Sequence, residues 1–128
     1  MPMIGLGTDG ITDPSIIARA IQEIGYRTID SASRYKNEEV VGNGVRKVLE
    51  EGKIKREELF IITKVWIDEV ENVEAACRRS LTKLGLDYVD LYLLHWPIAV
   101  RTISEANSET GEAAVYEKIK MPVHKIWP

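Results

Sequence analysis

The sequence has a single cysteine, no long apolar run and no excess of basic charge. Cys77 has no partner for an intrachain disulfide, which fits a reducing compartment. The sequence has no run of about 20 apolar residues, so it predicts no transmembrane helix. The first residues lack the features of a signal peptide. A net charge of −3 gives no reason to expect nucleic acid or an anionic membrane as a partner. We therefore expect a soluble cytoplasmic protein, and 128 residues is typical of one domain.

Short apolar segments alternate with amphipathic segments along the first 97 residues. The apolar segments are typical of buried strands, and the amphipathic segments have apolar residues at helical spacing. This alternation predicts a parallel α/β sheet covered by helices. The expected strands are 3–8, 26–30, 59–65 and 88–95, and the expected helices are 13–25, 37–52 and 69–85.

The predicted helices carry recognisable start and stop signals. Asp13 and Asn37 are suitable N-caps for the first and second helices, and Gly25 is a suitable stop for the first. Gly42 and Gly44 lie inside the second helix, where each glycine costs roughly 1 kcal/mol.

The alternation ends after Pro97. Residues 98–120 are mixed and polar, and we interpret them as a long loop after the fourth strand, a kind of segment that is usually functional or disordered. Residues 121–128 resemble the start of a further element.

Ionisable residues lie at the carboxyl ends of three successive predicted strands. Asp30, Lys64 and His95 are 34 and 31 positions apart, which is close to the repeat of one strand–helix unit. Tyr35 follows the second strand closely, in a loop on the same side. Taken singly, the acid, the tyrosine and the histidine each have a structural explanation. Lys64 is harder to explain in this way, because an ammonium group in a buried strand needs a partner or a depressed pKa. The coincidence of four such groups predicts a functional site at this edge of the sheet.

Several segments also carry a family resemblance. Residues 25–42, 59–66 and 80–97 closely resemble the N-terminal signature blocks of the aldo-keto reductases, and residues 4–8 resemble the first barrel strand of that family. The resemblance implies a parallel (β/α)₈ TIM barrel. The chain 1–128 would then be a partial barrel domain, the N-terminal half only, with about four strands and three to four helices.

The resemblance implies an oxidoreductase that uses NADPH, or NADH, to reduce small aldehydes and ketones to alcohols. The catalytic tetrad of the family corresponds to Asp30, Tyr35, Lys64 and His95. Tyr35 would protonate the carbonyl oxygen, and the ammonium group of Lys64, paired with Asp30, would make the phenol a better proton donor. His95 would orient the carbonyl.

The same resemblance assigns binding residues. Thr8 and Asp30 would contact the nicotinamide riboside of the cofactor, and no metal is implied. The substrate pocket would include Asp9, Trp66 and Trp96. Asp9 stands where many carbonyl-reducing members have an aromatic residue, which leaves the substrate preference open.

Family barrels have roughly 300 residues, so four strands amount to about half a barrel. Three interpretations stay open. The chain is a piece of a complete aldo-keto reductase, or a truncated relative that serves as a structural or binding subunit without activity, or a half-barrel that pairs with a second copy. Because an open half-barrel exposes strand edges, we expect either self-association or a missing C-terminal half.

Overall fold

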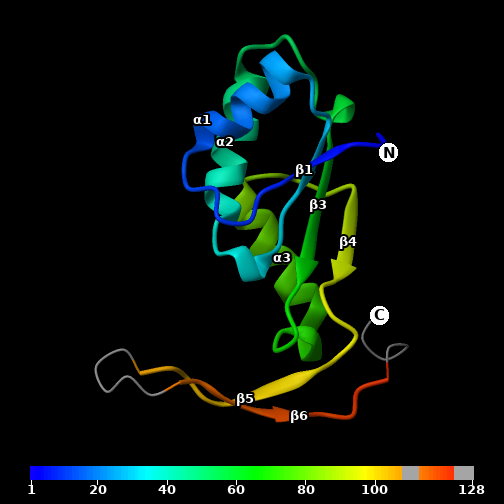
Figure 1. The fold of residues 1–128 in the computed structure, drawn as a ribbon. Helices are drawn as coiled ribbons and strands as arrows, with labels where there is room; N and C mark the ends of the chain where they lie inside the picture. Colours follow the sequence, from blue (N-terminus) through cyan, green and yellow to red (C-terminus); the bar gives the residue numbers. More distant parts are fainter. Residues whose placement is uncertain (108–112, 123–128) are drawn as a thin grey trace.

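The computed structural model describes residues 1–107 and 113–122. Its centre is a four-stranded parallel sheet in the order β1-β2-β3-β4, and the helices α1, α2 and α3 lie on one face of it (Figure 1). The arrangement confirms the predicted parallel α/β fold and forms a partial barrel. The strands are β1 (Gly5–Gly7), β2 (Thr28–Asp30), β3 (Phe60–Val65) and β4 (Leu91–Leu94), and the helices are α1 (Pro14–Arg19), α2 (Glu38–Glu50) and α3 (Val73–Leu84).

The first helix begins and ends where the local signals place it. Asp13 Oδ1 accepts a hydrogen bond of 2.8 Å from the Ser15 amide, and Pro14 occupies the first helical position. A π-helical turn, Ala20–Ile24, continues α1 and ends at Gly25, whose φ of +91° lies in the left-handed region. Glycine adopts this conformation without steric cost, so the chain turns directly into β2.

Asn37 precedes α2 as expected, but its side chain does not cap the helix. Its amide nitrogen instead donates to the carbonyl oxygens of Thr8 at 2.6 Å and Ile11 at 2.9 Å. Asn37 is therefore the N-cap residue, as predicted, but its side chain makes no capping hydrogen bond. The reason is burial: Asn37 is only 7% exposed, and its donors satisfy carbonyl groups of the turn that follows β1.

The core lies between the sheet and its helices. Ile29 and Ile61, on neighbouring strands, are fully buried against α1 and α2. The buried residues of this core are Ile17, Ala18, Ile21, Ile29, Val41, Val45, Val48, Ile54, Leu59, Ile61 and Leu84. Short 3₁₀ turns at Ser33–Tyr35, Arg56–Glu58 and Val70–Asn72 complete the connections.

The two glycines inside α2 permit close helix packing. A Cβ atom on Gly42 would lie 2.6 Å from the carbonyl carbon of Leu84 in α3. A Cβ atom on Gly44 would lie 2.6 Å from both the Ile17 side chain and the Pro14 carbonyl oxygen. Both glycines therefore let backbone approach backbone across the helical layer, which outweighs their low helix propensity.

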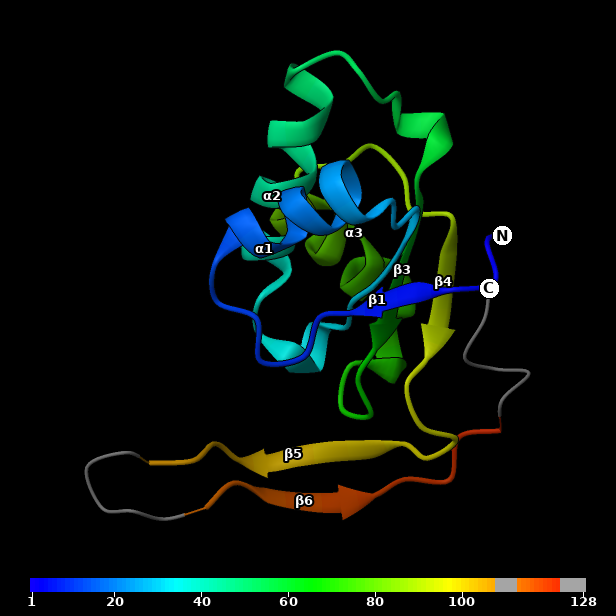
Figure 2. The ribbon, with the colours of Figure 1, turned by 45° about the horizontal axis from the view of Figure 1, so that its top comes forward.

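Residues 98–120, expected as a loop, include an antiparallel pair of strands, β5 (Val100–Ser104) and β6 (Val115–Lys118). This hairpin lies beyond the carboxyl ends of β3 and β4 (Figures 1 and 2). The Val100 amide donates to the Ile67 carbonyl at 2.9 Å, which fastens it to the loop after β3. Most of its side chains are exposed, so no apolar alternation marks it in the sequence. Of the further element expected at 121–128, residues 123–128 lie outside the described residues.

A charged cluster holds the amino ends of β3 and β4 together. The Arg56 guanidinium donates to Asp90 Oδ2 at 2.7 Å and to the carbonyl oxygens of Leu59 and Tyr88 at 2.9 and 3.0 Å. It also lies 3.9 Å from the centroid of the Tyr88 ring. Asp90 accepts a further bond of 2.8 Å from the Ile61 amide. These contacts fix β3 against β4 at the end remote from Asp30.

The sheet has two open edges, β1 and β4, and the face opposite the helices is partly exposed. On that face Leu93 is 36% exposed, and Phe60 and Leu91 are half-buried. Near β1, Met3 and Ile4 are exposed. Unpaired edges and apolar side chains together favour association with another sheet.

Replacing Gly42 by alanine is expected to destabilise the protein by about 1–3 kcal/mol, because the added methyl group collides with the backbone at Leu84. At an exposed glycine in a helix, the same substitution would instead stabilise the protein, because alanine has the higher helix propensity. Urea denaturation measures the change. The exposed neighbour Asn43 serves as control, and Asn43→Ala should stay within about 0.5 kcal/mol of the parent. A stabilising effect of Gly42→Ala would contradict the packing argument.

The 128-residue chain, expressed on its own, is expected to self-associate, because β1 and β4 leave unpaired backbone groups next to apolar side chains. Size-exclusion chromatography with light scattering tests this. The result that speaks against it is a monodisperse monomer of 14.5 kDa.

Candidate active site

The structure brings Asp30, Tyr35, Lys64 and His95 together at the carboxyl ends of the strands. Asp30 ends β2, and Lys64 lies near the end of β3. His95 directly follows β4, and Tyr35 ends the 3₁₀ turn after β2. The catalytic roles that the sequence suggests for these four residues stay predictions, and their proximity is observed.

Lys64 is at the centre of the cluster. Its ammonium nitrogen lies 2.8 Å from Asp30 Oδ1 and donates to the Ser31 carbonyl oxygen at 2.9 Å and to the Tyr35 hydroxyl at 3.3 Å. Its side chain is 13% exposed. The ammonium group thus has two hydrogen-bond acceptors, Ser31 and Tyr35, and one ion-pair partner, Asp30. The three contacts fix the position and direction of the charge.

Parallel pairing explains why these side chains meet. Asp30 is opposite Ile62, and Lys64 lies two residues farther along the same strand, on the same face of the sheet. The Asp30 and Lys64 side chains are thus diagonal neighbours across β2 and β3. The His95 amide donates to the Val65 carbonyl at 3.1 Å, which extends the β3–β4 ladder to the histidine.

The His95 ring is packed by two aromatic side chains. The Tyr35 ring lies edge-on to it with centroids 5.6 Å apart, and the Trp66 ring does so at 5.0 Å. Burial lowers the pKa of His95 below its ordinary value of 6.5, and the charge of Lys64 acts in the same direction. The imidazole is therefore neutral at pH 7 and carries one N–H donor.

Thr8 and Asp9 come from the turn after β1. Thr8 is fully buried, and its hydroxyl donates to the Asp30 carbonyl oxygen at 3.0 Å, so it holds the end of β2. Asp9 is exposed, and its charge acts on His95. Next to Thr8, a Cβ atom on Gly7 would meet nothing within 4 Å, and Gly7 pairs with Asp30 in the sheet. The space beside Gly7, on the strand next to Asp30, is therefore open.

The three residues expected in a substrate pocket follow three different strands: Asp9 follows β1, Trp66 follows β3 and Trp96 follows β4. Trp66 lines a polar cavity of about 290 Å³ together with Ser33, Arg34, Lys36, Asp68, Glu69, Thr102 and Glu105. Neither Asp9 nor Trp96 lines it. Trp96 follows His95 and is 55% exposed. The pocket assignment of Asp9, Trp66 and Trp96 stays a prediction.

Arg34 and Glu69 also lie near the site, although the sequence did not indicate a role for either residue. The Arg34 guanidinium lies 5.3 Å from the centroid of the Trp66 ring, and Glu69 accepts hydrogen bonds from Ser33 and from the Trp66 amide. Glu69 belongs to the charged stretch 68–71, and nothing local distinguishes it from the other acids there.

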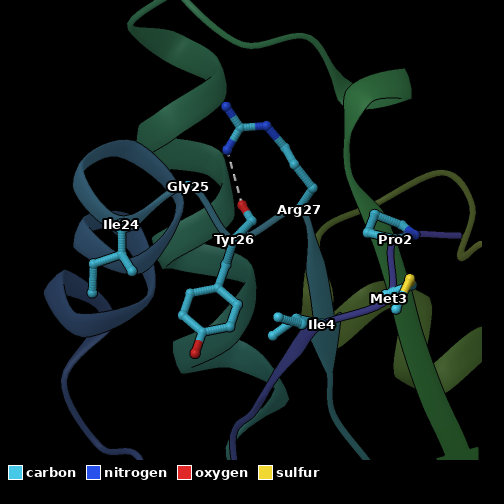
Figure 3. Close-up of a pocket in the computed structure, with 7 residues that line it drawn as sticks. All are labelled: Pro2, Met3, Ile4, Ile24, Gly25, Tyr26 and Arg27. Atoms are coloured by element: carbon cyan, nitrogen blue, oxygen red, sulfur yellow. Dashed lines mark hydrogen bonds between the residues drawn. The ribbon is translucent and has the colours of Figure 1, made fainter.

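A second hollow, of about 440 Å³, lies at the amino end of β2 (Figure 3). It is mostly apolar, and its lining residues are Pro2, Met3, Ile4, Ile24, Gly25, Tyr26 and Arg27. Arg27 donates to the carbonyl oxygens of Ile21 and Tyr26, both at 2.9 Å. Because this hollow is at the opposite end of the strand from Asp30, it is not continuous with the cluster around Lys64.

Within residues 1–107 and 113–122, no group of three or more His, Cys, Asp or Glu side chains is arranged to hold a metal ion. In the same part of the chain, no helix has the length and apolar character needed to cross a membrane.

Comparison with known proteins gives one consistent family. The family model described as the aldo/keto reductase family matches residues 6–118. The methylglyoxal reductase DkgA of Escherichia coli is 50% identical over 101 residues, which cover 77% of this chain and 35% of that protein. The chain spans about a third of the length of the curated relatives that it matches.

Solved structures agree with this. The aldose reductase from Schistosoma japonicum superposes with a TM-score of 0.81 at 32% identity, and the match covers 99% of this chain and 43% of that one. A Bombyx mori aldo-keto reductase, solved in complex with NADP, superposes with a TM-score of 0.71 at 42% identity, over 79% of this chain and 36% of that one.

The His95 signal in an NMR titration is expected to titrate below pH 6.5, and Lys64→Met is expected to raise its pKa. The substitution removes a positive neighbour and leaves the Asp30 carboxylate, which favours the charged imidazole. His95→Gln identifies the signal. Lys83→Met, which removes a lysine from the last turn of α3, should leave the titration unchanged. An unchanged His95 pKa in Lys64→Met would show that the two groups do not interact.

Proposed function

The chain belongs to the aldo/keto reductase family, and we propose that it carries the proton-donating half of a carbonyl reductase site. The reaction is the reduction of small aldehydes or ketones to alcohols with NADPH, or alternatively NADH. The observation that carries the proposal is the set of contacts around Lys64, whose ammonium group joins the Asp30 carboxylate to the Tyr35 hydroxyl.

Tyr35 is the proton donor in this proposal. As its proton passes to the carbonyl oxygen, negative charge develops on the phenol oxygen. The Lys64 ammonium, 3.3 Å away, is already in place to stabilise that charge. Because the ion pair with Asp30 and the hydrogen bond to the Ser31 carbonyl already hold the ammonium group, Lys64 needs no reorientation during the reaction.

His95 orients the substrate. A neutral imidazole with one N–H can donate a hydrogen bond to the carbonyl oxygen without competing with Tyr35 as a strong acid. The edge-on contacts with Tyr35 and Trp66 hold the ring in one orientation. The carbonyl oxygen would thus be bound between His95 and Tyr35.

The residues after β1 and β2 fit the reacting end of a nicotinamide cofactor. The Asp30 carboxylate, whose strand end is held by the buried Thr8 hydroxyl, would lie at its ribose side, and the open space beside Gly7 would admit the ring. A bound nicotinamide cofactor would supply the hydride. The NADP complex of the Bombyx mori relative supports the choice of cofactor, and the name of the Escherichia coli relative supports a small carbonyl substrate.

Tyr35→Phe in the natural protein is expected to lower kcat for aldehyde reduction by about 10²–10⁴-fold and to leave NADPH affinity nearly unchanged. The variant keeps the ring that packs against His95 and removes only the proton donor. Lys64→Met should be similarly damaging, because it also leaves Asp30 unpaired. Steady-state kinetics and nucleotide titration measure both effects.

Tyr88→Phe is the matched control, because Tyr88 lies with Arg56 at the opposite end of the sheet. It should retain the kcat of the parent protein. Full turnover by Tyr35→Phe would refute the assignment of the proton donor, and a parent protein that reduces no carbonyl would refute the proposed function itself.

A further inference from the structure

The Glu69 carboxylate accepts hydrogen bonds from three separate parts of the chain. Its Oε2 atom accepts from the Ser33 hydroxyl at 2.8 Å and from the Trp66 amide at 3.4 Å. Its Oε1 atom accepts from the Arg79 guanidinium in α3 at 3.0 Å. The side chain of Glu69 is 26% exposed. One acid thus joins the loop after β2, the loop after β3 and the helix behind them.

The two loops joined in this way carry residues of the candidate active site. Ser33 begins the 3₁₀ turn that ends at Tyr35. Trp66 follows β3, and its ring packs edge-on against His95. Because His95 is packed between the Tyr35 and Trp66 rings, the distance between the two loops sets the space available to the imidazole.

The chemistry of the contact requires an ionised carboxylate. All three partners of Glu69 are donors, and a carboxylate is the side-chain group that only accepts. Burial disfavours the charge, but hydrogen bonds from Arg79, Ser33 and the Trp66 amide outweigh it, so the pKa of Glu69 lies below its ordinary value. The acid is therefore charged at neutral pH.

Two neighbouring acids, Glu71 and Glu74, have other partners. Glu74 pairs with Arg78 on the exposed side of α3, and Glu71 pairs with Arg101 of the hairpin. Each of these two pairs joins an acid to one arginine that is not part of the cluster around Lys64. Glu69 differs because two of its partners belong to the loops beside Tyr35 and His95.

We propose that Glu69 is a positioning residue of this site, which holds the Tyr35 loop against the Trp66 loop and thereby fixes the His95 ring between them. The inference rests on the proposed carbonyl reduction for its kinetic consequence. Its structural consequence, the fixed contact of Trp66 and Tyr35 with His95, does not depend on the reaction.

The test is Glu69→Gln in the natural protein. A glutamine amide presents two donors in place of one acceptor oxygen, so at least one of the three contacts is lost. We expect kcat for aldehyde reduction to fall on the order of tenfold to hundredfold, because the misplaced loop groups no longer hold the reacting geometry. The affinity for NADPH should be nearly unchanged.

Nuclear Overhauser effects between the ring protons of His95 and those of Trp66 and Tyr35 report the geometry directly. They should weaken or disappear in Glu69→Gln. Glu74→Gln, which removes the partner of Arg78 on α3, is the control and should retain both the Overhauser effects and the kcat of the parent. Persistence of the effects in Glu69→Gln, together with a kcat equal to that of the control, overturns the proposal.

Ser33→Ala is the second variant, in case Glu69→Gln does not fold. It removes one contact and leaves the pair of Glu69 with Arg79 intact. We expect weaker Overhauser effects between Tyr35 and His95 and a several-fold lower kcat. Unchanged values overturn the proposal. If the parent protein shows no carbonyl reduction, the proposed function fails, and the Overhauser effects still decide the role of Glu69.

Discussion

The buried ammonium group of Lys64 is the constraint on which the rest of the site depends. A charged group that has lost most of its water must recover that energy from fixed partners. Asp30, the Ser31 carbonyl and Tyr35 provide them, and all three come from the end of β2 or the loop that follows it. The lysine therefore binds β3 to one particular conformation of the chain after β2. A loop that could otherwise move is ordered by the electrostatic requirement of a neighbouring strand.

The helical layer supports this arrangement from behind. The α2 helix begins three residues after Tyr35, and its glycines let α1 and α3 approach it closely. The first turn of α2 also places Glu38, which is nearly fully buried, where it accepts a 2.6 Å hydrogen bond from the Thr63 hydroxyl. Thr63 is the residue before Lys64, on the opposite face of β3. The two faces of the strand are thus fixed by polar contacts to the same segment of chain.

Much of this fold could be predicted from the sequence, because its signals act over short distances. Asp13 and Gly25 mark the ends of a helical segment through contacts within one turn, and the even spacing of the strand-end residues follows from the repeating strand–helix unit. The contacts of Asn37 with Thr8 and of Glu69 with Ser33 were not predictable in the same way. They join residues 29 and 36 positions apart, and the same side chains would also suit a cap or an exposed loop.

The two charged clusters occupy opposite ends of β3, which has consequences for how such a sequence can diverge. Along β3, Lys64 lies three residues, or about 10 Å, beyond Ile61, which is the last strand residue that the Arg56 cluster contacts. Changes that far apart without shared partners act almost independently. The loops beyond the carboxyl ends, including the hairpin, can therefore accumulate substitutions, insertions or new charges while Arg56 and Asp90 keep β3 and β4 in register. In a lineage of such proteins, substrate preference and strand pairing would be inherited as separate traits.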